Sequence, residues 1–307
     1  MVDFKNIILE VLLTPLKIYK SMQLMTSNVK NAKYEHQLAI VSIIKNEGNY
    51  IEEWVRYHQL VGVDKIYLYD NGSTDNTKDI LRPYADSGLV EIIDFPGVKR
   101  QRPAYINALN RLRHKCKYVA FIDADEFLKP CHNGDNMVEL LDKIMAQDPH
   151  AGGVALNWRM FGSSHLEDRP LGREAKGVIE SFLYRAASNK KGNNCVKTIL
   201  RPEFAYYFES VHYPLYIYGY HSIDENGHIV KAWHNEIDEP QVARINHYFT
   251  KSKAEWIKRR SLGMADNKTK KRSLDEFDAH DNNDIYDDSM LYYANILNQV
   301  KSPTNGK

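Results

Sequence analysis

The sequence has little cysteine, no long uncharged apolar run and no excess of either charge. Its three cysteines are odd in number and far apart, at positions 116, 131 and 195. They fit neither a disulfide framework nor a C-x-x-C zinc site, which indicates a reducing compartment. No run of about 18 apolar residues without a charge occurs, so no membrane-spanning helix is predicted. Lys and Arg number 41 against 40 Asp and Glu, a balance that argues against a dedicated nucleic-acid binder.

The chain does contain enough apolar surface to fold. Apolar residues make up 43% of the 307 residues and aromatic residues 11%, so a sizeable core is expected and global disorder is excluded. No internal repeat and no break in composition forces a domain boundary.

The first residues form a separate segment. Residues 4–20 are apolar but interrupted by Glu10 and Pro15, and they lack a small-residue cleavage pattern, so a signal peptide is not predicted. Lysines flank the apolar positions. One interpretation is an amphipathic helix lying on an anionic membrane. The other is a helix packed on the main domain or on a second copy of the chain.

Apolar runs and helical periodicities alternate along the next part of the chain. This alternation predicts an α/β fold with an open, mostly parallel sheet covered by helices. A late helix is expected across Val242 to Trp256, and the apolar run Met290–Leu297 predicts a C-terminal helical segment. The expected strands are 38–44, 65–69, 89–93, 117–122 and 153–158, with helical patterns between them.

Polar clusters follow three of these strands, at the edge where such sheets bind ligands. Two carboxylates two residues apart, Asp123 and Asp125, suit Mg²⁺ or Mn²⁺, which also take diphosphate oxygens as ligands. The carboxylate of Asp70 suits a ribose hydroxyl or a base edge. Each cluster alone also suits a turn or a helix cap, but together they predict a site. The clusters are Lys45-Asn-Glu47, Asp70-Asn-Gly-Ser-Thr-Asp75 and Asp123-Ala-Asp-Glu126.

These segments resemble the GT-A nucleotide-sugar glycosyltransferases, with glycosyltransferase family 92 as the best match and family 2 as a further relative. The resemblance extends from about Leu38 to the late helix. Its motifs include Ile43-Ile-Lys-Asn-Glu-Gly-Asn-Tyr50, Asp70-Asn-Gly-Ser-Thr-Asp75, Phe121-Ile-Asp-Ala-Asp-Glu-Phe127, Asn157-Trp-Arg-Met-Phe-Gly162, Lys197-Thr-Ile-Leu-Arg-Pro202, Val211-His-Tyr213 and Ile245-Asn-His-Tyr-Phe-Thr-Lys-Ser252.

The resemblance implies a transferase that moves a sugar from a nucleotide diphosphate donor with Mn²⁺ or Mg²⁺. It implies that Asp70 holds the uridine and ribose, with Asn46 and Glu47 near it. It also implies that Asp123 and Asp125 bind the metal and the diphosphate.

Further residues take roles through the same resemblance. His212 matches the histidine that often completes the metal shell, although a histidine satisfied in an aromatic core is an equally good interpretation. Lys197 is implied to face the diphosphate, and Arg201 is expected on the surface. Three residues of the expected late helix are interpreted as packing residues, with a lid role as the alternative: His247, Tyr248 and Lys251.

The catalytic base is the least defined element. Inversion at the anomeric carbon, which the resemblance favours, needs a carboxylate that deprotonates the acceptor hydroxyl. Glu167 and Asp168 look like the acidic pair of family 2 and are the predicted catalytic residues, with Asp168 preferred. Glu209 and Glu236 remain open alternatives.

The sequence therefore predicts a metal-dependent glycosyltransferase that uses a UDP-sugar and a glycan or lipid-linked acceptor. The expected organisation is an amphipathic segment (1–33), a GT-A domain (34–260) and an extension packed on it (261–307). A sequon at Asn71 lies in the expected nucleotide loop. A glycan on Asn71 would occupy this loop, which favours a cytoplasmic protein that never meets the glycosylation machinery. The protein would contact the inner face of the membrane if the first helix binds lipid. Oligomers are compatible with this prediction. A nucleotidyltransferase and a non-catalytic nucleotide- or glycan-binding protein are the alternatives.

Overall fold

The computed structural model describes residues 33–169, 176–236, 239–261 and 273–300 of the chain. The expected N-terminal amphipathic helix lies outside the described residues, apart from Lys33. Residues 262–272 and 301–307 of the expected C-terminal extension also lie outside them.

A mixed ten-stranded sheet forms the centre of the described structure, in the order β12-β11-β6-β8-β4-β1-β2-β3, with β13 pairing both β5 and β6. β1 is parallel to β2 and β4, whereas β8 runs antiparallel between β4 and β6. The strands of this sheet are β1 (His36–Ile44), β2 (Lys65–Asp70), β3 (Val90–Asp94), β4 (Cys116–Phe121), β5 (Glu126–Pro130), β6 (Ala151–Met160), β8 (Val196–Leu200), β11 (His221–Ile223), β12 (Ile229–Val230) and β13 (Ala243–His247).

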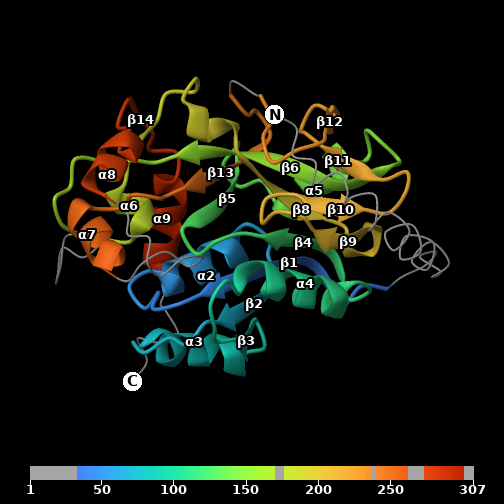
Figure 1. Ribbon diagram of the computed structural model, residues 1–307, viewed down its shortest axis with the longest axis horizontal. Helices are drawn as coiled ribbons and strands as arrows, with labels where there is room; N and C mark the ends of the chain where they lie inside the picture. The colour runs from blue at the N-terminus through green and yellow to red at the C-terminus, as the bar shows by residue number, and fades with distance from the viewer. Residues whose placement is uncertain (1–32, 170–175, 237–238, 262–272, 301–307) are drawn as a thin grey trace, which may run out of the picture.

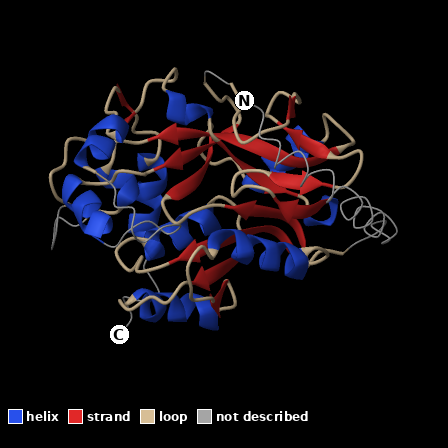
Figure 2. Ribbon diagram, viewed as in Figure 1, coloured by secondary structure: helices blue, strands red, loops and turns tan. Residues whose placement is uncertain are grey.

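The described residues also contain two two-stranded sheets and eight α-helices. Figure 1 shows α6 to α9 gathered on one side of the molecule, and in Figure 2 the arrowheads of the parallel strands β2, β4 and β6 point toward that side, whereas β8 runs the opposite way. The helices are α2 (Ile51–Leu60), α3 (Thr77–Asp86), α4 (Gln101–Leu112), α5 (Met137–Met145), α6 (Val178–Ser181), α7 (Lys253–Ser261), α8 (Leu274–His280) and α9 (Leu291–Gln299); the paired short strands are β9 (Ala205–Phe208) with β10 (Pro214–Tyr216) and β7 (Tyr184–Arg185) with β14 (Ile285–Tyr286).

Both faces of the sheet are covered, as expected for parallel strands rich in β-branched residues. Along β1, Leu38 and Ile40 pack in the cluster that contains Trp54 of α2. The alternate residues Ala39 and Val41 pack in the cluster on the α4 side. The predicted strand–helix alternation and the open, mostly parallel α/β sheet are therefore confirmed. Among the described helices, none combines the length and apolarity that a membrane crossing requires.

The expected late helix is wrong over its first half. Residues Ala243–His247 form β13, and helix α7 begins at Lys253. The strand is buried along its whole length, and its polar residues Arg244, Asn246 and His247 are buried with it. Arg244, for example, binds Asp287 at 2.6 Å. Since the polar residues do not mark a solvent-facing side, the period-two alternation of a strand is hidden in the sequence.

A buried histidine joins α2 to β5. The Nδ1 of His58 lies 2.8 Å from the carbonyl of Trp54, and its Nε2 accepts the backbone N–H of Leu128 at 3.2 Å. These two bonds require a neutral ring with the proton on Nδ1. Burial lowers the pKa of His58 to about 3. Because β5 begins at Glu126, this contact also anchors the strand that follows the Asp123–Asp125 turn.

The free energy of unfolding is expected to fall on acidification through His58. The folded pKa lies below the unfolded value of about 6.5, so the stabilisation is complete above that pH and is lost as the pH falls toward 3. Between pH 7 and pH 5 the loss from this group is about 2 kcal/mol. Urea titrations at both pH values measure it.

His58→Gln is expected to reduce that pH dependence, whereas His114→Gln, at an exposed histidine, should retain the wild-type dependence. An unchanged pH dependence in His58→Gln would contradict the assignment.

Candidate active site

The turn between β4 and β5 is held from several sides. The backbone N–H of Asp123 donates to Glu126 Oε2 at 2.8 Å, and the indole of Trp54 donates to the carbonyl of Glu126 at 2.8 Å. The N–H of Tyr248 donates to the carbonyl of Asp125 at 2.8 Å. The backbone of the Asp123–Asp125 turn is thus fixed before any ligand binds.

Asp123 lies beside a buried lysine. The ammonium of Lys197, which is fully buried on β8, lies 3.0 Å from Asp123 Oδ2 and 3.5 Å from Glu126 Oε2. Gln101 donates to Asp123 Oδ1 at 2.6 Å and the hydroxyl of Tyr105 donates at 3.4 Å. Burial alone would lower the pKa of Lys197, but the two carboxylates outweigh it and raise this pKa. Lys197 is therefore a permanent cation at the predicted diphosphate site.

Asp125 has two basic neighbours on different elements. His247 Nε2 on β13 lies 3.5 Å from Oδ1, and the guanidinium of Arg259 on α7 lies 3.3 Å from Oδ2. Burial alone would raise the pKa of Asp125, but His247, Arg259 and Lys251 outweigh it and hold the pKa well below its usual range. Asp125 is therefore an anion in the folded protein.

The loops after β1 and β2 are bound to each other. Asn46 has a left-handed backbone with φ 57°, its side-chain oxygen accepts the N–H of Thr74 at 2.7 Å, and its own N–H donates to the hydroxyl of Ser73 at 2.9 Å. Asp70 is 1% exposed, accepts the N–H of Ser73 on both oxygens at 3.2 Å, and lies 3.1 Å from Lys78.

Glu47 extends this cluster toward Asp125. Its N–H donates to the hydroxyl of Thr77 at 2.9 Å, and its carboxylate lies 3.9 Å from the ammonium of Lys251. Burial raises the pKa of Glu47, with Lys251 acting in the opposite direction. Because β1, β2 and β4 are parallel neighbours, the three predicted polar clusters do lie along one edge of the sheet.

The two candidate histidines have different surroundings. The imidazoles of His212 and His247 both contact the ring of Trp158, with centroids 5.1 and 4.3 Å away. His212 Nδ1 lies 3.1 Å from the carbonyl of Val196, and burial beside Lys197 lowers its pKa to about 4. The contact to Asp125 is made by His247, which the sequence analysis had placed in a helix; the Ile245-Asn-His-Tyr motif was the available signal.

The predicted catalytic carboxylates lie on an exposed segment after β6. Glu167 is 80% exposed and lies 3.1 Å from Lys253. Asp168 accepts the N–H of Arg169 at 2.7 Å, and Arg169 stacks on the ring of Tyr50 at 4.8 Å. Arg201 binds Glu203 at 3.3 Å. Glu209 and Glu236 are exposed.

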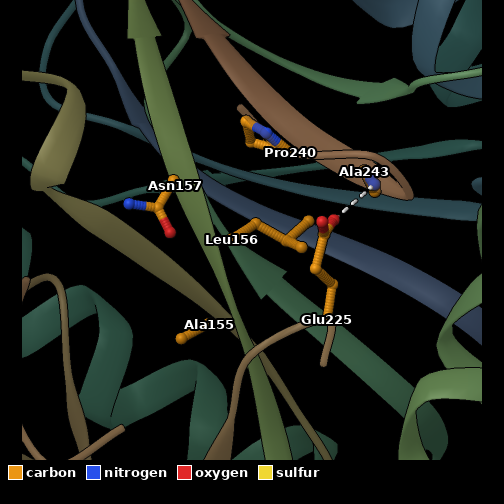
Figure 3. A pocket seen from close by; sticks show the side chains of 6 residues that line it. All are labelled: Ala155, Leu156, Asn157, Glu225, Pro240 and Ala243. Atoms are coloured by element: carbon orange, nitrogen blue, oxygen red, sulfur yellow. Dashed lines mark hydrogen bonds between the residues drawn. The ribbon is translucent and has the colours of Figure 1, made fainter. Parts of the chain in front are cut away.

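A small pocket is lined by none of the predicted site residues (Figure 3). It measures about 150 Å³, including space open to solvent, and is lined by residues of β6, Glu225, Pro240 and Ala243. Sites for small molecules usually measure at least about 300 Å³. The carboxylate of Glu225 accepts the N–H groups of Gln241, Val242 and Ala243 at 2.7, 2.9 and 3.3 Å. This carboxylate therefore fixes the start of β13, the strand that carries His247.

The donor set fits a divalent metal shared with a substrate. Among the described residues, no group of three or more His, Cys, Asp or Glu side chains is arranged as a metal cage. Mg²⁺ and similar ions are, however, commonly held by one or two carboxylates plus substrate phosphates. His247 has Asp125 on its Nε2 side, while its Nδ1 lies 3.9 Å from Glu126 Oε1. His247 Nδ1 and Glu126 Oε1 are both buried without a hydrogen bond. A carboxylate on the far side of the histidine ring is typical of histidines that bind metals.

Comparisons with known proteins agree with the sequence resemblance. The model of Glycosyltransferase family 92 matches residues 41–288. A glycosyltransferase family 92 protein from Ricinus communis is 27% identical over 169 residues, which cover 55% of this chain and 29% of the relative. A beta-1,4-galactosyltransferase from Caenorhabditis elegans is 20% identical over 215 residues, which cover 66% of this chain and 48% of the relative. The chain thus spans less than half the length of both relatives.

One solved structure with a similar arrangement is that of S. aureus TarS, residues 1–349, in complex with UDP. It aligns with a TM-score of 0.35 and 14% identity, over 54% of this chain and 47% of that chain.

Removing the buried ammonium is expected to destabilise the fold. Lys197→Met leaves Asp123 and Glu126 without their buried counter-charge, which costs about 3–5 kcal/mol in free energy of unfolding. Adding Glu126→Gln removes one of these charges and should restore about 1 kcal/mol or more. Denaturant titrations of the single and double variants measure both values.

Lys117→Met is the control, since that lysine is 28% exposed and binds the half-exposed Asp142; it should cost about 1 kcal/mol or less. Equal costs for the two lysine variants would show that Lys197 is not the buried counter-charge of the turn.

Proposed function

The chain belongs to glycosyltransferase family 92, and from that premise we propose that it transfers a sugar from a nucleoside diphosphate donor to a glycan or lipid-linked acceptor. One observation carries the proposal: the loops after three parallel strands bring Asn46–Glu47, Asp70 and Asp123–Asp125 to one edge of the sheet. In open α/β sheets this edge is where ligands bind.

The nucleoside is proposed to bind at the joined loops after β1 and β2. Asp70 is a buried carboxylate at a strand end, so it suits a ribose hydroxyl or the edge of a base. The hydrogen bonds between Asn46 and residues 73–74 hold these loops together in advance, which lowers the entropic cost of binding. We propose uridine as the base and a UDP-sugar as the donor.

The diphosphate is proposed to lie beside Asp123, Asp125 and Lys197. Asp125 and His247 would hold the Mn²⁺ or Mg²⁺ that the family implies, with Glu126 behind the histidine. When bound, such a metal offsets the charge that develops on the departing diphosphate. Lys197 supplies a fixed positive charge on the Asp123 side of the same edge, where it stabilises developing negative charge without reorganisation.

We further propose inversion at the anomeric carbon, with Asp168 removing the proton from the acceptor hydroxyl. Support comes from the acidic pair of the family resemblance and from the position of Arg169, which ties this segment to Tyr50 and to the carbonyl of Asn49 near the β1 loop. Glu167 already binds Lys253 at the surface, so Asp168 is preferred.

The cellular setting is proposed from the sequence. We propose a cytoplasmic enzyme that contacts the inner membrane face through its apolar, lysine-flanked N-terminal segment, where a lipid-linked acceptor would be available.

Asp125→Asn is expected to lower kcat by about 100-fold or more, because it weakens the cation site opposite the leaving group. The measurement is UDP release from a panel of UDP-sugars with Mn²⁺. Asp79→Asn, at a 70% exposed carboxylate on α3, is the control and should keep wild-type kcat. Full turnover in Asp125→Asn would contradict the proposed site, and UDP binding without turnover in the wild type would favour a non-catalytic binding protein.

Asp168→Asn is expected to lower kcat by about 100-fold or more with little change in the Kd for UDP, because a general base acts on the acceptor and not on the nucleotide. Glu167→Gln is the matched neighbour and should have a much smaller effect. If Asp168→Asn keeps wild-type kcat, the base is another carboxylate.

A further inference from the structure

The two aspartates of the turn differ in how firmly they hold their partners. Asp123 binds Lys197, whose side chain is 0% exposed, and also accepts a hydrogen bond of 2.6 Å from Gln101. Asp125 shares its outer oxygen, Oδ2, with Arg259, whose side chain is 38% exposed. One aspartate therefore has a buried cationic partner, and the other has a partner that reaches solvent.

Lys197 has no route away from Asp123. It extends from the centre of the sheet, between β4 and β6, and its ammonium is enclosed together with the carboxylate of Glu126. Moving it would leave the buried carboxylate of Glu126 unpaired, which is strongly destabilising. We therefore expect Lys197 to stay beside Asp123 when ligands bind.

Arg259 can leave Asp125. It lies near the end of α7, and its two terminal nitrogens approach Asp125 Oδ2 at 3.4 and 3.3 Å, distances at the long end for hydrogen bonds. Its other bond is to the carbonyl of Phe249 at 3.3 Å. The side chain of Arg259 is 38% exposed, whereas that of Asp125 is 10% exposed. Water can therefore hydrate the guanidinium when it leaves, and an incoming cation would replace its charge beside Asp125.

A guanidinium and a divalent metal would compete for the charge of the Asp125 carboxylate. Both carry positive charge and repel each other, and the guanidinium has no atom that can serve as a metal ligand. The diphosphate proposed to bind at this edge is a better partner for the planar guanidinium fork than a single carboxylate oxygen.

We propose that Arg259 occupies the cation position of Asp125 in the ligand-free protein and exchanges it for the diphosphate when metal and nucleotide bind. The proposal rests on the proposed donor site and adds a residue that the sequence analysis did not identify. Arg259 opposes the metal when it binds alone and supports the metal–nucleotide complex. Free metal is thus held weakly until the donor arrives.

The exchange predicts opposite effects of one substitution on two affinities. In the full-length chain, Arg259→Gln is expected to bind Mn²⁺ alone about two- to fivefold more tightly, because a weak competing ion pair is removed. With Mn²⁺ at saturation, the same variant is expected to bind UDP about tenfold more weakly, because a charged hydrogen bond to the diphosphate is lost. Electron paramagnetic resonance of free Mn²⁺ measures the first affinity and calorimetry the second.

Lys253→Gln is the matched control. It removes one positive charge from the same helix, but Lys253 binds Glu167 at the surface, not Asp125. Both affinities of this variant should equal those of the wild type. Thermal unfolding of all three proteins tests whether a change in affinity is a change in folding.

Three results would overturn the exchange. The first is Mn²⁺ affinity in Arg259→Gln that is equal to or weaker than in the wild type. The second is no Mn²⁺ binding in either protein while UDP still binds, which leaves the transferase function standing. The third is UDP binding that needs Arg259 but not Mn²⁺, in which case the guanidinium replaces the metal. By contrast, tighter Mn²⁺ binding in the variant with no UDP binding in any protein would support the competition at Asp125 and contradict the UDP donor.

Discussion

The buried ammonium of Lys197 is the constraint on which the candidate site depends. β8 runs antiparallel between β4 and β6 and places this lysine beneath the turn that joins β4 to β5. There it is the shared counter-charge of Asp123, at 3.0 Å, and of the buried Glu126, at 3.5 Å. Without it, the carboxylate of Glu126 would be buried without a cationic partner on this side, next to a second carboxylate. The antiparallel strand in an otherwise parallel region therefore has a chemical consequence: it brings a fixed cation to the edge where the other strands bring anions.

The other ionisable side chains around Lys197 and Asp123 differ in how exposed they are to solvent. His247, Glu126 and Lys251 are buried, the Glu47 side chain is 24% exposed, and the Arg259 side chain is 38% exposed. A ligand can displace only the outer partners at low cost, since buried charges lose too much when separated. The inner charges thus define where a metal and a diphosphate would bind, and the outer ones provide the part of the site that changes on binding.

The parts of the site that follow a strand were predictable, because a strand end is visible in the sequence as an apolar run that meets a polar cluster. Asn46, Asp70, Asp123 and Asp125 were found in this way, and the structure places them along one edge. The sequence pattern places His247 in a helix, whereas the structure has it on β13. All five residues of β13 are buried, polar ones included, so the strand period is hidden. No sequence pattern marked Arg259 as a site residue, since a helix rich in lysine and arginine is usually exposed to solvent.

The sequence by itself determined the α/β class, the order of its first strands, the family and the carboxylates of the strand-end clusters. Each of these follows from residues close together in the chain, through periodicity or through a motif. Only the tertiary structure decided which cation meets which carboxylate. Lys197 and Asp123 are 74 residues apart, and Arg259 and Asp125 are 134 apart, so their pairing is set by strand order and by the packing of α7. Sequence patterns predict local structure through their periodicity. They do not predict the distances between charged side chains that are far apart in the chain, and these distances set the strength of the electrostatic interactions.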